Sequence, residues 1–160
     1  MRSLFSGSVF YFCIMNTDVC FLIGGIILFF IFINVLLYFY HKNRHILFFK
    51  TIKGRNYTSI KNIETSIESY SKIGAKLTYY KAEIVFLNHE IFIIPFNKPI
   101  LQLIHSPENF PYVSLQFNTS FKEIRNDILE IQGDTGLGNF KITLNFKNKN
   151  FDLHSVMYTM

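Results

Sequence analysis

The pattern of apolar and polar positions begins with one long apolar run. Val19–Tyr40 is 22 residues long, and Asn34 is its only clearly polar side chain. A helix of that length rises about 33 Å, enough to cross the roughly 30 Å hydrocarbon core of a bilayer. Because only a helix satisfies its own backbone hydrogen bonds in lipid, the run predicts one transmembrane helix. Tyr38 and Tyr40 end it as interfacial aromatic residues do.

A cleaved signal peptide is the alternative interpretation of this run. Its apolar core would have only ~7–15 residues and would end in small residues. The observed run is longer and ends in aromatic residues and His41, which favours an uncleaved anchor. Residues 1–18 form a predicted N-terminal leader, in which Met15 is an alternative start to Met1.

After the membrane run the spacing of apolar residues changes. Residues 41–75 are predicted to form a basic juxtamembrane linker with a short amphipathic helix. Its apolar side chains recur every three or four residues, which is helical periodicity. They are Ile60, Ile63, Ile67, Tyr70 and Ile73. Gly74 follows at a position typical of a helix C-terminus.

From Lys76 onward the apolar period becomes two, which predicts a β-rich domain over residues 76–160. Leu77–Leu87 and Ile91–Phe96 flank Asn88-His89, and this arrangement predicts a hairpin. The further predicted strands are Ile100–His105, Tyr112–Phe117, Asp127–Gln132 and Phe140–Phe146. Since no helical stretch separates the strands, a parallel sheet is disfavoured. The predicted fold class is α+β: a transmembrane helix, a short amphipathic helix, then a small antiparallel bent sheet or barrel.

The order of these strands resembles a pleckstrin-homology-like (PH-like) or GRAM-like domain. The resembling residues are the hairpin Leu77–Phe96, the strand Phe140–Phe146 and the closing segment from Phe151. The chain is also similar to uncharacterised single-pass bacterial membrane proteins that carry one such β domain behind a helix. The resemblance implies a PH-like fold. It does not imply phosphoinositide binding, because the turn Asn88-His89-Glu90 lacks the Lys/Arg cluster of lipid-binding members.

Positive charge is concentrated in the residues that follow the apolar run. The net charge is +5, yet residues 62–160 hold nine Lys/Arg against ten Asp/Glu. Six cations without an acid precede them and are called the basic collar: Lys42, Arg44, Lys50, Lys53, Arg55 and Lys61. Because cationic residues resist translocation, the collar predicts an N-terminus outside and a cytoplasmic C-terminal domain. The collar is either this topological signal alone or also a surface for anionic lipid.

Composition narrows the class of protein further. Apolar residues make up 49% of the chain and charged residues 17%, against ~25% charged residues in ordinary soluble proteins. This composition excludes a disordered chain, which needs few aromatics and many charges. The nearly neutral β domain disfavours nucleic acid as a partner, since phosphate contacts would supply little affinity.

Candidate chemistry is sparse along the sequence. Cys13 and Cys20 are the only cysteines, which excludes a disulfide framework or a thiol site in the β domain. Gly133–Gly138 lacks the Lys and hydroxyl of a phosphate-binding loop, so a hairpin loop is predicted there. His41 and His45 are four residues apart without a third metal ligand nearby, which favours polar anchors.

Three acids, Glu123, Asp127 and Glu130, are interleaved with Lys122 and Arg125. A pair of catalytic carboxylates needs a cleft, whereas alternating charges are typical of a solvated strand edge. We therefore expect no catalytic, metal or cofactor site at these residues.

The sequence predicts a membrane-anchored, non-enzymatic binding or adaptor module on the cytoplasmic face. Its expected partners are the lipid bilayer and a protein, and no cofactor is expected. One alternative is a structural subunit of a membrane complex, with Gly24, Gly25 and Asn34 as candidate helix-packing residues. Asn34 is otherwise a tolerated polar residue near the cytoplasmic end. The other alternative is an enzyme whose site the pattern does not reveal.

Overall fold

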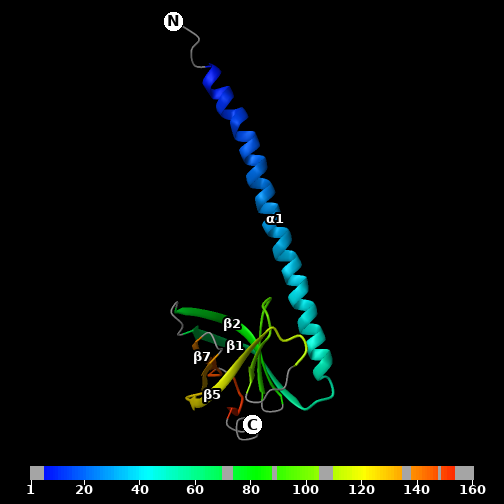
Figure 1. Cartoon of the computed structure of the whole chain (residues 1–160), viewed down its shortest axis with the longest axis vertical. Coiled ribbons are helices and arrows are strands. Elements are labelled where there is room, and N and C mark those ends of the chain that lie inside the picture. The colour runs from blue at the N-terminus through cyan, green and yellow to red at the C-terminus, as the bar shows by residue number, and fades with distance from the viewer. Residues whose placement is uncertain are drawn as a thin grey trace. The chain divides into compact units, whose positions relative to one another are not determined.

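The computed structural model describes residues 6–69, 74–87, 90–104, 110–134, 138–147 and 149–153, with side chains from Val19 onward. One helix, α1 (Ser6–Ile52), precedes seven strands in these residues (Figure 1). The strands are β1 (Tyr57–Ser69), β2 (Ala75–Leu87), β3 (Glu90–Pro95), β4 (Leu101–Ile104), β5 (Leu115–Arg125), β6 (Ile128–Asp134) and β7 (Asn139–Asn145). The chain divides into two compact units, Met1–Tyr40 and His41–Met160. Residues 41–52 of α1 therefore belong to the same unit as the strands.

The first unit confirms an N-terminal helix long and apolar enough to cross a membrane. Most of its large apolar side chains are exposed, from 45% for Val35 to 80% for Phe21. A helix with apolar residues on every side is typical of a lipid environment, whereas an amphipathic surface helix has them on one side only. The apolar helix runs from Val19 to Ile52, but cations begin at Lys42, so Val19–Tyr40 is the part suited to hydrocarbon.

The second unit is built around a closed barrel with the strand order β1-β2-β3-β4-β5-β6-β7. β7 closes the barrel by pairing antiparallel with β1. This confirms the α+β class, with the barrel as the form that the sheet takes. One pair departs from the antiparallel prediction, since β4 and β5 run parallel with Leu101 opposite Leu115. Residues 105–114 connect this parallel pair, and 105–109 lie outside the described residues.

Alternate strand residues fill the barrel interior. In β7 the side chains of Phe140, Ile142 and Leu144 are buried and their neighbours are not, as the period of two predicted. Gly133 of β6 allows close approach here, because a Cβ at this position would lie 1.9 Å from the Asn118 carbonyl oxygen. The interior therefore depends on a residue without a side chain where β5 and β6 meet.

The predicted amphipathic helix is corrected by the structure, which places Tyr57–Ser69 in β1; residues 70–73 lie outside the described residues. Ile60, Ile63 and Ile67 all pack against the barrel interior. The pairing of β1 with β2 shifts register on both sides of Ile63, and Asn62 has a φ of 60°. Such a bulge inserts one extra residue, so the side chains beyond it point to the opposite face of the sheet from the one that strict alternation predicts. It thereby produces helix-like spacing in a strand.

The predicted linker is likewise corrected, because α1 continues through Ile52. Phe48 and Ile52 are fully buried against the outer face of β2 and β3. The Phe48 ring centroid lies 5.0 Å from that of Phe92. This second cluster, called the outer core, contains Phe48, Ile52, Val85, Leu87, Phe92, Ile94, Ile100 and Phe110. β3 is therefore buried on both faces, which explains its apolar sequence from Ile91 to Pro95.

A buried polar group lies on β3 and β4 beside these apolar residues. Glu90 is 1% exposed and Gln102 is fully buried. The Gln102 amide donates a hydrogen bond to the Glu90 carboxylate and accepts one from Gln116 at 3.2 Å. Because buried polar groups cost free energy when unpaired, this network fixes the arrangement of β3, β4 and β5.

Candidate functional site

The first turn of the second unit ties α1 to the barrel through polar contacts. The Nε2 atom of His45 lies 2.9 Å from the carbonyl oxygen of Lys98, in the connection after β3. Since a carbonyl only accepts, Nε2 carries the proton in this contact. The Arg44 guanidinium donates to the Ser114 hydroxyl at 3.1 Å, just before β5. Two side chains of the helix, Arg44 and His45, are thus held against two separate connections of the barrel.

These residues create a locally positive environment. Burial lowers the pKa of His41, and the neighbouring charges of His45, Lys98 and Arg44 lower it further. The neutral imidazole is therefore favoured at His41, since an additional positive charge would be repelled. Each of the three neighbouring side chains that shift this pKa is basic, which makes this surface attractive to anions.

A groove of about 250 Å³ opens next to His45. It is lined by His45, Lys61, Asn62, Lys81, Ala82, Glu83, Ile94, Pro95 and Phe96. Lys61 and Lys81 supply two cations, and the carboxylate of Glu83 accepts a hydrogen bond from the Ser59 hydroxyl. Phe96 stands at the groove with 75% of its surface exposed. We call this feature the bulge groove, since it contains the bulge of β1.

Backbone irregularities at the bulge groove explain why a hollow forms there. Asn62 at the bulge has a φ of 60°, and Asn97, next to Phe96, has a φ of 53°. Left-handed residues other than glycine are uncommon, and asparagine adopts this conformation at the lowest cost. Bulges bend strands and redirect side chains, and they occur often beside functional sites. The local sequence therefore gives the groove its shape.

The structure separates the six residues of the basic collar. Arg44 lies among the basic side chains around His41, and Lys61 lines the bulge groove. Arg55 lies over the Phe110 ring, with 5.2 Å between its guanidinium carbon and the ring centroid. Lys42, Lys50 and Lys53 are exposed on the helix end and the turn that follows it.

Two cations that the sequence analysis did not single out complete the surface. Lys81 lies on β2 and Lys98 follows β3, far from α1 along the chain. No local spacing signals their approach to His45. Only the packing of α1 against β2 and β3 brings them there, so sequence periodicity had no means of identifying them.

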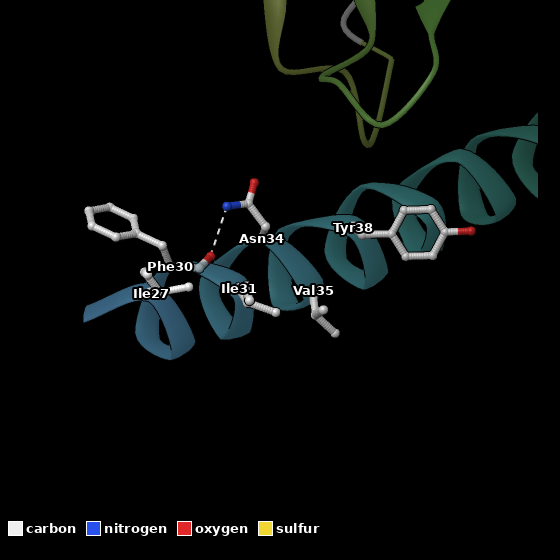
Figure 2. A pocket seen from close by; sticks show the side chains of 6 residues that line it. All are labelled: Ile27, Phe30, Ile31, Asn34, Val35 and Tyr38. Carbon is white, nitrogen blue, oxygen red and sulfur yellow. Dashed lines mark hydrogen bonds between the residues drawn. The ribbon is translucent and has the colours of Figure 1, made fainter. Parts of the chain in front are cut away.

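The candidate helix-packing residues lie in the first unit. Figure 2 shows a shallow hollow along α1 that is lined by Ile27, Phe30, Ile31, Asn34, Val35 and Tyr38. The Asn34 amide nitrogen donates to the Phe30 carbonyl oxygen at 2.8 Å, within the same helix. Around Gly24 and Gly25 no atom lies within 4 Å of an added Cβ. Both glycines thus leave room for another helix.

The remaining candidate chemistry has structural explanations. The described residues contain no group of three or more potential metal ligands. Glu123 and Glu130 form ion pairs with Arg125 and Lys141, at 2.6 and 2.9 Å. Asp134 of β6 pairs with Asn139 of β7, so the glycine-rich segment connects a hairpin, and its residues 135–137 lie outside the described residues.

Comparison with models of known protein families, with curated proteins and with solved structures finds no match. The likeness to PH-like and GRAM-like domains accordingly stays a prediction. The features that bear on function are the apolar helix, the barrel packed on residues 41–52 of α1, and the bulge groove.

Proposed function

We propose that this protein is a membrane-anchored, non-enzymatic binding module that presents the bulge groove at the cytoplasmic surface of the membrane. One observation carries the proposal: residues 41–52 of α1 form a single compact unit with the barrel. Phe48 and Ile52 are completely buried in the outer core. The barrel is therefore attached to residues 41–52 of α1 through packed side chains.

The first basic residues of the second unit follow the apolar run closely along the chain. His45 comes five residues after Tyr40, a rise of about 7.5 Å along a helix. This is close to the ~8 Å Debye length at physiological ionic strength. Arg44, four residues after Tyr40, is consequently close enough along the chain to be attracted by anionic headgroups.

The groove itself suits an acidic segment of a cytoplasmic protein. Lys61 and Lys81 supply positive charge, while Ala82, Ile94 and Pro95 supply an apolar floor. Mixed apolar and polar linings are typical of specific binding sites. The exposed ring of Phe96 adds an aromatic contact of the kind that contributes strongly at interfaces.

The cytoplasmic placement is tested by protease protection of a C-terminally tagged full-length protein. We expect cleavage of the tag only after the cells are permeabilised, because the basic collar resists translocation. Cleavage in intact cells would contradict the orientation and would place the groove outside.

The binding role is tested by a photoreactive phenylalanine analogue in place of Phe96 in living cells. A discrete cross-linked protein is expected, and Lys61→Glu with Lys81→Glu should reduce it. The matched controls are the same analogue at Phe121, which is 49% exposed outside the groove, and Lys147→Glu. Equal products from both positions, or products insensitive to groove charge, would refute binding at the groove.

A further inference from the structure

We propose that two copies of this chain associate in parallel through one face of α1. Five residues define this face, which we call the Asn34 stripe: Gly24, Ile27, Ile31, Asn34 and Tyr38. Their spacings of three, four, three and four residues average 3.5, the repeat of helices that pair along a common seam. The proposal goes beyond the binding role of the barrel and rests on different residues.

The shape of the stripe fits a second helix. Four of its five residues, all except Gly24, line the hollow whose side chains Figure 2 draws. A hollow between successive turns receives a side chain from a facing helix in knobs-into-holes packing. Gly24 at the N-terminal end of the stripe has nothing within 4 Å of an added Cβ, so a neighbouring backbone can approach there.

The polarity of Asn34 explains why a partner is needed. Its hydrogen bond to Phe30 uses one of its two amide hydrogens. The second amide hydrogen and the side-chain carbonyl are left among Ile27, Ile31 and Val35, whose side chains offer no hydrogen bond. In hydrocarbon no water replaces the missing partner, so these groups favour contact with a polar side chain of another helix.

A second copy satisfies this requirement without any additional component. All copies cross the membrane in the same direction, so paired copies are parallel. A twofold axis then places each residue of the seam opposite itself. Asn34 meets Asn34 of the other copy, and an amide both donates and accepts. A single asparagine in a helix seam is also known to select a parallel pair with one register.

Cys20 provides a native reporter for this contact. It lies four residues before Gly24, which continues the stripe, and its thiol is free and exposed. We would express the full-length chain with Cys13→Ser in its own membranes and add a short bis-maleimide. A product of twice the 18.8 kDa chain mass is expected. A product of any other mass would show that a different protein occupies the stripe and would overturn the proposal.

The face is tested by moving the cysteine within a Cys13→Ser, Cys20→Ser background. Ile27→Cys should form the dimeric product, because residue 27 lies on the stripe. Phe29→Cys is the matched control, since residue 29 lies on the opposite side of the helix. Equal cross-linking at the two positions would indicate random collision and would refute the stripe.

The polar contact is tested with Asn34→Leu, read out through Cys20. Hydrogen bonds between membrane helices contribute amounts that correspond to a roughly three- to 18-fold change in association. We expect a loss of cross-linked dimer in that range. Asn34→Leu with Leu36→Asn keeps the composition and moves the amide to the opposite face, so it should not restore the product. Unchanged cross-linking in Asn34→Leu would contradict the proposal.

The proposed binding at the bulge groove and the proposed pairing through the Asn34 stripe can be refuted independently of each other. Asn34→Leu changes no residue of the bulge groove, so photo-cross-linking from position 96 should persist in that variant if the groove acts without dimerisation. The groove variant Lys61→Glu with Lys81→Glu should leave Cys20 cross-linking intact. Loss of Cys20 cross-linking in this groove variant would contradict a dimer contact confined to α1.

Discussion

Phe48→Ala tests whether the end of α1 is a structural part of the barrel unit. Phe48 is fully buried, and its ring contacts Phe92 with 5.0 Å between centroids. Truncating a buried phenylalanine costs about 3–5 kcal/mol, because apolar contacts are lost and a cavity remains. Whole domains are stable by only about 5–15 kcal/mol. The variant should therefore lose a large fraction of the unfolding free energy of the second unit.

The measurement is thermal unfolding of the full chain in mild detergent. Near-ultraviolet circular dichroism is suitable, since tyrosine and phenylalanine report tertiary packing while the long helix dominates the far-ultraviolet signal. A unit of this size lies between the smaller and larger domain classes, so about 4 °C per kcal/mol predicts a midpoint lowered by roughly 12–20 °C. Phe21→Ala is the matched control, because Phe21 is 80% exposed in the first unit and should leave the barrel midpoint unchanged.

Equal midpoints for the two variants would refute the reasoning. In that case the outer core would contribute nothing to the barrel, and residues 41–52 would act as a loose tether. The proposed function would lose the observation that carries it, because residues 41–52 would no longer form one packed unit with the barrel.

Three further predictions concern the stability of the second unit, measured by urea or thermal unfolding. Gly133→Ala should destabilise it by about 3 kcal/mol or more, since the added Cβ meets backbone, whereas Gly74→Ala should be nearly neutral because its nearest atom lies 3.9 Å away. Gln102→Leu should lower the unfolding free energy by about 1–3 kcal/mol, because it removes the hydrogen-bond donor to buried Glu90. The double variant Glu90→Leu with Gln102→Leu should recover part of this loss. Additive effects of the two changes would contradict the pairing. Because the folded unit lowers the pKa of His41, the unfolded chain binds its proton first, so stability should fall as the pH drops below about 6.5. His41→Gln should remove that part of the pH dependence, and an unchanged profile would refute the assignment.

Several features of the fold were predictable from short-range pattern. The apolar run identified the helix, and the period of two identified the hairpin of β2 with β3 and the alternation along β7. These features are determined within a few residues, because side-chain period reflects which face is buried. β1 was misassigned as a helix because a bulge at Asn62 gave its isoleucines helical spacing.

The site depended on contacts that no local pattern records. Lys81 lies on β2 and Lys98 follows β3. Each lies near the end of α1 only because the strands pair and α1 packs against them. The basic collar was recognisable as a group along the chain, yet the structure distributes its members over separate surfaces. Charge can be counted from sequence, but its spatial arrangement cannot.

The sequence by itself determined the long apolar helix, the cationic stretch after it and a β-rich remainder, since each follows from local composition and period. The tertiary structure alone decided that the strands close into a barrel, that β4 and β5 run parallel, and that Phe48 and Ile52 join the barrel rather than a linker. The physical reason is that β3 carries apolar side chains on both faces. The barrel interior buries only one face, so the end of α1 covers the other, and this packing creates the groove beside His45.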